Sequence, residues 1–158
     1  MGGDTTAEEV VALKPDLVLA GRHSAFATRN ALKRVGIRFE LFDVPESIAE
    51  SLQQIRTLAA LLHQEQRGAD LIARIEQALV AARPAPGSPI LTAAVYQADG
   101  QTAGAQTVTG ELMQIAGIDN LPAHYGINQH RPLSLEQLLM APPDILLVGE
   151  TTRGAVTH

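Results

Sequence analysis

The chain has 158 residues, 46% of them hydrophobic, which is enough for one ordinary domain or for two small lobes. Its net charge of −5 and its 12 scattered basic residues exclude the clustered Lys and Arg of a nucleic-acid-binding protein. The absence of cysteine excludes disulfide bonds, thiolate metal sites and a cysteine nucleophile. There is no apolar run of about 18 residues and no signal-like start. The chain is therefore either cytoplasmic or separated from its export signal.

The opening of the chain predicts a βαβ unit. Thr6 and Glu9 form the sequence pattern of a capping box and begin the first helix. The apolar run at residues 16–20 is typical of a fully buried parallel strand. A second helix at about residues 25–35 and an alternating strand at residues 37–42 follow. A strand, a helix and a strand with short joints predict a parallel sheet.

The longest helical stretch runs from Ser47 to about Ala82. Apolar residues recur at spacings of three and four along both of its halves, as on one face of a helix. The halves are separated by a polar segment at residues 63–68, where we expect a break or kink. Taken as one rod, the stretch would be about 55 Å long at about 1.5 Å per residue.

Three prolines and a glycine at residues 84–89 form the clearest boundary in the chain. After it we expect a strand at 90–97, a helix near 109–116, a helix at 135–140 and a last strand at 144–148. The predicted domains are a partial N-terminal lobe (1–46), a connecting helix region (47–83) and a partial C-terminal lobe (84–158).

Two segments of the chain match without gaps, Thr6–Gly21 and Ser134–Gly149, so that Glu8 matches Glu136. Each contains a capping residue, an early Glu, an apolar helix face, Pro-Asp, an apolar strand and a glycine. One explanation is that many α/β folds share such helix–strand segments. The alternative is a pair of related lobes facing each other across a cleft, with a ligand outside the carboxyl ends of the strands.

Six short motifs follow one another along nearly the whole chain: Ala7–Leu19, Val35–Ile37, Ser47–Leu52, Ile115–Asn120, Ser134–Leu139 and Pro143–Ile145. This ordered set resembles the helical-backbone class (class III) of periplasmic binding proteins for siderophores, haem and cobalamin. The resemblance implies an α/β fold of two Rossmann-like lobes with parallel sheets, joined by a long α-helix. It also implies that both lobes are incomplete here, because the family has further elements beyond both ends.

The same resemblance implies a function and partners. The chain would be the substrate-binding component of an ABC importer, capturing a ferric siderophore, haem or cobalamin between its lobes and delivering it to the permease subunits. It would act in the periplasm or be lipid-anchored outside the cytoplasmic membrane, with its signal segment absent from this chain. We expect no resident cofactor, no directly bound metal and no nucleic acid. Unpaired sheet edges would invite a homo-oligomer or swapped dimer.

Loops that follow the predicted strands supply the candidate ligand residues. Arg22 and His23 follow the first strand and Arg153 follows its repeat partner, and guanidinium groups suit carboxylates on a chelate. Tyr96 and Gln97 end the first strand of the second lobe, where a tyrosine could form a wall for a planar ligand. Solvated loop arginines and a half-buried tyrosine are the simpler alternatives. The predicted ligand-binding residues are Arg22, His23, Tyr96, Gln97, Arg153 and, from the Gly- and Thr-rich loop, Thr102.

Glu8 and Glu136 occupy equivalent first helical turns, where a carboxylate favours the helix dipole. They also align with the surface glutamates that, in the resembled family, dock into arginine pockets of the permease. A haem iron could in addition be reached by His124, Tyr125 or His130.

We expect no enzyme, because the sequence has no nucleophile elbow, paired-histidine metal motif or phosphate-binding loop. Two other functions stay open: a nucleotide-binding α/β enzyme domain and a cytoplasmic interaction module that dimerises through the long helix.

Overall fold

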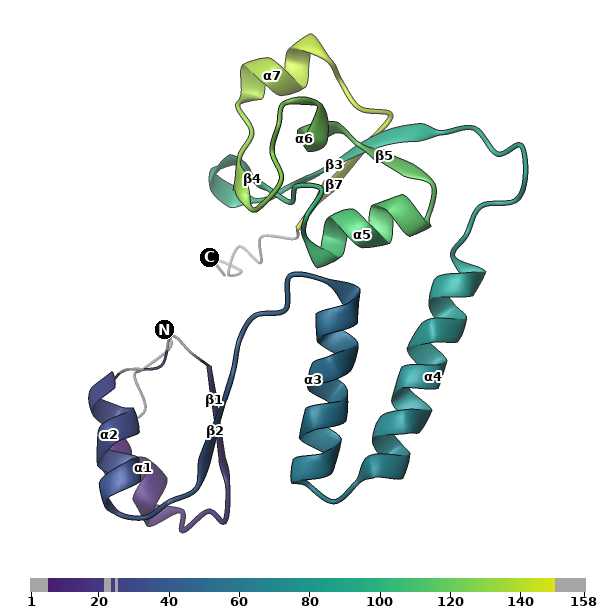
Figure 1. Cartoon of the computed structure of the whole chain (residues 1–158). Helices are drawn as coiled ribbons and strands as arrows, with labels where there is room; N and C mark the ends of the chain where they lie inside the picture. Colours follow the sequence, from purple (N-terminus) through teal and green to yellow (C-terminus); the bar gives the residue numbers. More distant parts are fainter. Residues whose placement is uncertain (1–5, 22–23, 25, 150–158) are drawn as a thin grey trace, which may run out of the picture. The chain divides into compact units, whose positions relative to one another are not determined.

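The computed structural model describes residues 6–21, 24 and 26–149 (Figure 1). The chain divides into two compact units, Met1–Val44 and Pro45–His158. The helical region predicted as a separate connector, residues 47–83, belongs to the second unit. No helix within the described ranges is both long enough and apolar enough to cross a membrane.

The first unit confirms the predicted βαβ arrangement. Its elements are α1 (Ala7–Ala12), β1 (Val18–Gly21), α2 (Phe26–Arg34) and β2 (Phe39–Phe42). β1 and β2 pair in parallel. The predicted capping box is also confirmed, because the side chains at the start of α1 satisfy each other's backbone N–H groups.

The expectation of a fully buried first strand is wrong. Residues of β1 alternate between half-buried and exposed, and Leu19 is 47% exposed. Within the described part of the chain this sheet has two strands, and α1 and α2 lie on one side of it (Figure 1). A sheet covered on one face can bury only every second side chain.

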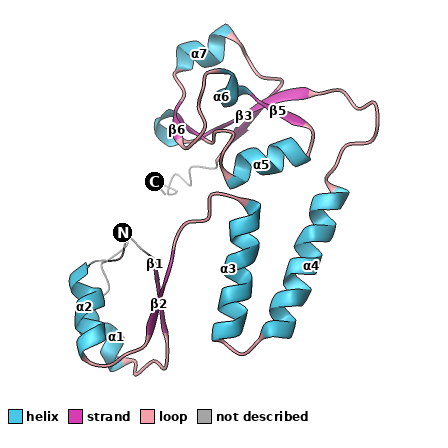
Figure 2. Ribbon diagram, viewed as in Figure 1, coloured by secondary structure: helices cyan, strands magenta, loops and turns pink. Residues whose placement is uncertain are grey.

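The second unit opens with α3 (Ile48–Leu61) and α4 (Glu65–Ala81). Ser47 caps α3 by accepting a hydrogen bond from the backbone N–H of Glu50. The predicted break lies where expected, with His63 at a positive φ of 52°. The interpretation as one rod is wrong, because α3 and α4 pack side by side as a helical hairpin (Figure 2).

Two close contacts involve this hairpin: one joins α3 to α4, and the other joins α3 to α5. A Cβ added at Gly68 of α4 would lie 2.5 Å from the Cβ of Ala59 on α3, so the glycine lets the two helices approach. At the start of α3, the backbone N–H of Ile48 donates to Oε2 of Glu111 at 2.7 Å. A carboxylate from another helix therefore satisfies one of the unpaired N–H groups in the first turn of α3.

A three-stranded parallel sheet forms the centre of the second unit. Its strands are β3 (Leu91–Tyr96), β5 (Ile118–Asn120) and β7 (Ile145–Val148), in the order β5-β3-β7. Strands β3 and β7 were predicted, whereas the three-residue β5 was not. The sheet confirms the predicted α/β class with parallel strands.

The connections between these strands contain short elements: η1 (Ala98–Gly100), β4 (Gln101–Thr102), α5 (Val108–Ile115), α6 (Leu121–His124), β6 (Arg131–Pro132) and α7 (Leu135–Met140). The limits of α7 are those predicted, and those of α5 differ by one residue. Strands β4 and β6 pair with each other in antiparallel orientation. They join the loop after β3 to the loop before α7.

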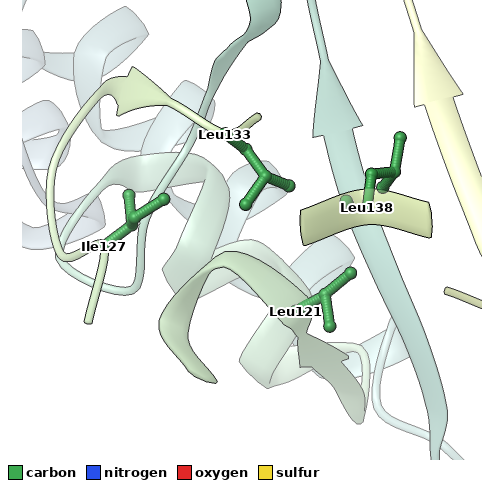
Figure 3. Close-up of a cluster of buried hydrophobic side chains, with 5 residues drawn as sticks. Leu121, Ile127, Leu133 and Leu138 are labelled. Atoms are coloured by element: carbon green, nitrogen blue, oxygen red, sulfur yellow. The ribbon is translucent and has the colours of Figure 1, made fainter. Parts of the chain in front are cut away.

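The buried core of the second unit lies where these connections meet the sheet. It consists of Ala94, Leu121, Ile127, Leu133 and Leu138. Figure 3 shows the four larger side chains gathered beside the sheet. Tyr96, Tyr125 and Ala141 pack against this cluster. The loops after β3 and β5 are thereby anchored on apolar packing.

The two copies of the sequence repeat adopt the same local structure in separate sheets. Ser134 and Gln137 form a capping box at α7 that matches the one at α1. The strand of the first copy pairs with β2, and the strand of the second copy pairs with β3. The copies therefore do not lie side by side in one continuous sheet, which is the arrangement that would have excluded twin lobes.

Candidate functional site

The carboxyl ends of the parallel strands in the second unit lie at one edge of the sheet. Tyr96 ends β3 and faces Val148, the last residue of β7, in the register. Asn120 ends β5 on the other side of β3. Ligands of parallel α/β sheets bind outside this edge, among the loops that leave it. The predicted residues Tyr96 and Gln97 are therefore placed at the expected edge.

Tyr96 is half-buried, and its ring lies over a tight turn. Its hydroxyl is 3.3 Å from the position that a Cβ would take at Gly100, whose φ is +74°. Gln97 is exposed, and its backbone N–H donates to the carbonyl of Gln101 at 2.8 Å. The turn after β3 thus holds the tyrosine ring at the strand end. Contact of Tyr96 and Gln97 with a ligand stays a prediction.

Thr102 lies inside the protein rather than on its surface. It is 2% exposed, and its Oγ1 has no hydrogen-bond partner among the residues whose structure is described. A ligand could touch this hydroxyl only if the loop around it moved. Its predicted ligand contact stays a prediction, and its burial favours a role in packing.

The charged candidates belong to the loops after β1 and β7. Arg22 and His23, which follow β1, and Arg153, which follows β7, lie outside the described residues. The glycines that end the two repeat copies, Gly21 and Gly149, are described and exposed. The three charged residues therefore stay predictions from the sequence.

Two of the three aromatic and imidazole candidates, His124 and Tyr125 at the end of α6, already form hydrogen bonds with protein groups. Nε2 of His124 lies 2.9 Å from Oδ1 of Asp119. The hydroxyl of Tyr125 donates to the carbonyl of Gln137 at 2.9 Å. His130 is exposed. Within the described ranges no three His, Cys, Asp or Glu residues gather closely enough to hold a metal ion.

Glu8 and Glu136 are both exposed in the first turns of α1 and α7. Neither carboxylate has an ion-pair partner among the described residues. Next to Glu136, Leu139 is 70% and Met140 is 84% exposed. The second copy of the repeat thus presents a carboxylate beside apolar side chains on an open helix face.

Sequence reasoning missed the role of Asp144 in the Pro-Asp motif. Its Oδ2 accepts hydrogen bonds from the backbone N–H of Thr92 at 2.8 Å and from its hydroxyl at 2.9 Å. The backbone and side-chain hydrogen bonds from Thr92 lower the pKa of Asp144. This residue joins the starts of β3 and β7, 52 positions apart. The recurrence of Pro-Asp in both repeat copies was the available signal.

A groove of about 500 Å³ runs along the α3–α4 hairpin. It contains none of the predicted ligand residues. It is lined by both apolar and polar residues: Ile55, Leu58, Ala59, Leu62, Gln64, Arg67, Gly68, Asp70, Leu71 and Arg74.

Comparison with known proteins identifies several relatives. The chain is 30% identical over 149 residues to a "Cobalamin-binding protein" of Halobacterium salinarum, covering 92% of this chain and 40% of that protein. It is 27% identical over 146 residues to the "Fe(3+)-citrate-binding protein YfmC" of Bacillus subtilis, covering 90% and 46%. It also matches the periplasmic heme-binding protein RhuT from Roseiflexus at 30% identity and a TM-score of 0.75, covering 90% and 57%.

The chain thus spans 40% to 57% of the length of these relatives. These relatives are named as binding proteins, in agreement with the prediction that the chain is not an enzyme. The resemblance to class III proteins for haem, iron and cobalamin is confirmed as well. The sequence model of the family described as periplasmic binding protein matches residues 2–156, and the chain belongs to that family.

Proposed function

We propose that this chain is part of the substrate-binding component of an ABC importer and takes up a metal chelate: a ferric siderophore, haem or cobalamin. Its membership in the periplasmic binding protein family carries this proposal. The names of the relatives, which bind cobalamin, ferric citrate and heme, support the ligand class. Such ligands are bulky and carry carboxylate or amide groups at their rims.

The binding site of this proposal lies outside the carboxyl ends of the parallel strands. Tyr96 supplies a flat surface for a macrocycle or chelate, and Gln97 lies exposed beside it. Arg22 and Arg153 would bind carboxylates in bidentate fashion, and His23 would approach the chelated metal. No resident cofactor takes part, because the metal arrives as a component of the cargo.

Titration with three defined probes tests the ligand class. Hemin, cyanocobalamin and ferric citrate are added separately to the purified chain and followed by calorimetry and visible absorbance. We expect saturable binding of at least one probe. Tyr96→Ala should weaken it about tenfold through loss of aromatic contact area, whereas Tyr96→Phe should retain it. A chain with native helix content that binds none of the three probes would contradict the proposal.

Delivery to a permease and a location outside the cytoplasmic membrane belong to the same proposal. Glu8 and Glu136 are the docking residues, because exposed carboxylates that form no ion pair with the described residues can form bidentate bonds with a partner's arginines. The apolar side chains of Leu139 and Met140 would add contact area around one of the two carboxylates.

A further inference from the structure

Two loops that leave the carboxyl edge of the sheet run side by side in the second unit. The first, after β3, continues from β4 to the start of α5, and the second, after α6, leads into β6. Backbone N–H groups of Gly104, Ala105 and Gln106 donate to carbonyls of the second loop, at Gln129, Ile127 and Asn128 respectively, over 2.7 to 3.3 Å. Together with the β4–β6 pairing, these bonds join the loops along most of their length. We call residues 101–107 and 127–132 the double loop.

Glycines allow the two backbones of the double loop to touch. A Cβ at Gly104 would overlap the backbone at Ile127 and Asn128. A Cβ at Gly110, in the first turn of α5, would overlap the carbonyl of Gly104. Backbone atoms occupy both of these positions. A side chain added at either glycine could therefore not be accommodated by rotation of a neighbouring side chain. The two segments of the double loop are therefore close-packed on each other, and residues 104–105 are close-packed on α5.

Two buried side chains fasten the double loop to the sheet and to α5. Nδ2 of Asn120, at the carboxyl end of β5, donates to the carbonyl of Ala103 at 3.1 Å. The hydroxyl of Thr107 donates to the carbonyl of Gly104 at 2.8 Å and accepts from the N–H of Gly110 at 3.0 Å. Asn120 is 8% exposed and Thr107 is 1% exposed, so water competes little for either bond.

Among the described residues, the side chain of Asn120 forms a hydrogen bond through its donor group only. Its Oδ1 has no hydrogen-bond partner among the described residues. An apolar side chain of similar size would leave no unpaired atom here, but it would also remove the hydrogen bond to the carbonyl of Ala103. The contribution of this amide is therefore the single bond that ties residue 103 to the carboxyl end of β5.

We propose that Asn120 is a positioning residue for ligand binding. Its amide holds the double loop as a rigid wall beside the carboxyl edge of the sheet. The exposed amide side chains of Gln106 and Asn128 on this wall form hydrogen bonds with carboxylate or amide groups at the rim of the ligand. Preorganised donors lose little conformational entropy when the ligand binds, so rigidity of the wall raises affinity. The inference rests on the proposed function.

The test combines amide hydrogen exchange with ligand titration. In the unchanged chain, the amides of Gly104, Ala105 and Gln106 should be protected like those of β3. In Asn120→Asp, which keeps the shape but loses the donor, they should exchange about tenfold faster while β3 stays protected. The affinity for whichever of hemin, cyanocobalamin or ferric citrate the unchanged chain binds should fall about tenfold. The matched change Asn30→Asp, on α2, should alter neither reading.

The outcomes separate this inference from the proposed function. If the unchanged chain binds none of the three probes, the proposed function fails and the ligand role of the wall fails with it. If it binds a probe and Asn120→Asp loosens the loop without lowering affinity, the inference alone is overturned. If Asn120→Asp does not fold, amide hydrogen exchange in the unchanged chain still tests whether the double loop is rigid. Unprotected amides at Gly104, Ala105 and Gln106 would refute a rigid wall.

Discussion

At the scale of single residues, the short polar links between strands carry information that hydrophobic patterns do not. Asp144 accepts two hydrogen bonds from Thr92 and so joins β3 to β7 where both strands begin. The bonds stabilise the ionised carboxylate, and this lowers the pKa of Asp144. A carboxylate whose pKa is lower in the folded state stabilises the fold at neutral pH and ceases to do so in acid.

Asp144→Asn should therefore lower the thermal midpoint of unfolding at neutral pH. The difference between the variant and the unchanged chain should stay constant above the ordinary carboxyl pKa of about 4 and shrink as the pH falls below it. Circular dichroism melts at several pH values measure this. Asp99→Asn, in the exposed turn after β3, serves as the control. A difference that grows in acid would contradict the assignment.

Under the proposed docking on a permease, Glu136→Arg should abolish stimulation of the importer's ATPase, because a like charge would face arginines of the partner. Glu136→Gln should reduce the stimulation only in part, since it keeps a hydrogen-bonding group. Transport ATPase assays in reconstituted vesicles measure the effect. Glu65→Arg, at another exposed first helical turn, is the matched control and should leave stimulation unchanged. Equal losses at both positions would point to a general charge effect.

The sequence predicted which residues begin helices, but few of the contacts that hold loops. The capping boxes at Thr6 and Ser134 involve neighbours three positions apart, so a local pattern reveals them. The bond from Asn120 to Ala103 spans 17 positions and the one from Thr92 to Asp144 spans 52. Such links depend on which residues of neighbouring strands face each other, and local patterns in a single sequence do not reveal this. For the same reason, Thr102 was expected at a surface and is buried.

At the scale of elements, the α3–α4 hairpin stands where a long helix with a break or kink was expected. Periodicity predicted both apolar faces and the polar break between them, because these are local properties. It could not distinguish a kinked rod from two helices folded back on each other, since both bury the same residues. The three-residue β5 and the two-residue β4 and β6 are too short to show any periodicity.

Gly68→Ala should destabilise the hairpin even though alanine favours a helix by about 1 kcal/mol over glycine. The new methyl group would meet Ala59 at 2.5 Å, and overpacking of this kind costs about 1–3 kcal/mol. Urea denaturation measures the loss. The double variant Ala59→Gly/Gly68→Ala should be more stable than the two separate losses predict. Simple additivity would show that the two residues do not limit the approach of the helices.

At the scale of the whole chain, the sequence repeat predicted two α/β sheets, and the structure contains both. The sequence did not predict how much of each sheet is covered by helices and how much is exposed. Strand β7 is the edge of its sheet among the described residues, and Leu146, Leu147 and Val148 on it are 44% to 66% exposed. Periodicity gives the face of a strand that should be buried, but not which segment buries it.

We expect the isolated chain to self-associate through β7, because an exposed apolar edge strand pairs readily with a copy of itself. Leu147→Lys should reduce the associated fraction in sedimentation velocity at a fixed protein concentration. Val80→Lys, at another exposed apolar position on α4, should not. Association that persists unchanged in Leu147→Lys would place the contact elsewhere.

The hydrogen bond between Glu111 and the N–H of Ile48 has a mechanical consequence. The start of α5 is bonded to the double loop through Thr107. Four residues later, the carboxylate of Glu111 accepts a hydrogen bond from the first turn of α3. A displacement of the double loop would therefore be transmitted through the first turns of α5 to the start of α3. Under the proposed function, a ligand bound against residues 101–107 would therefore also affect the position of α3 through Glu111.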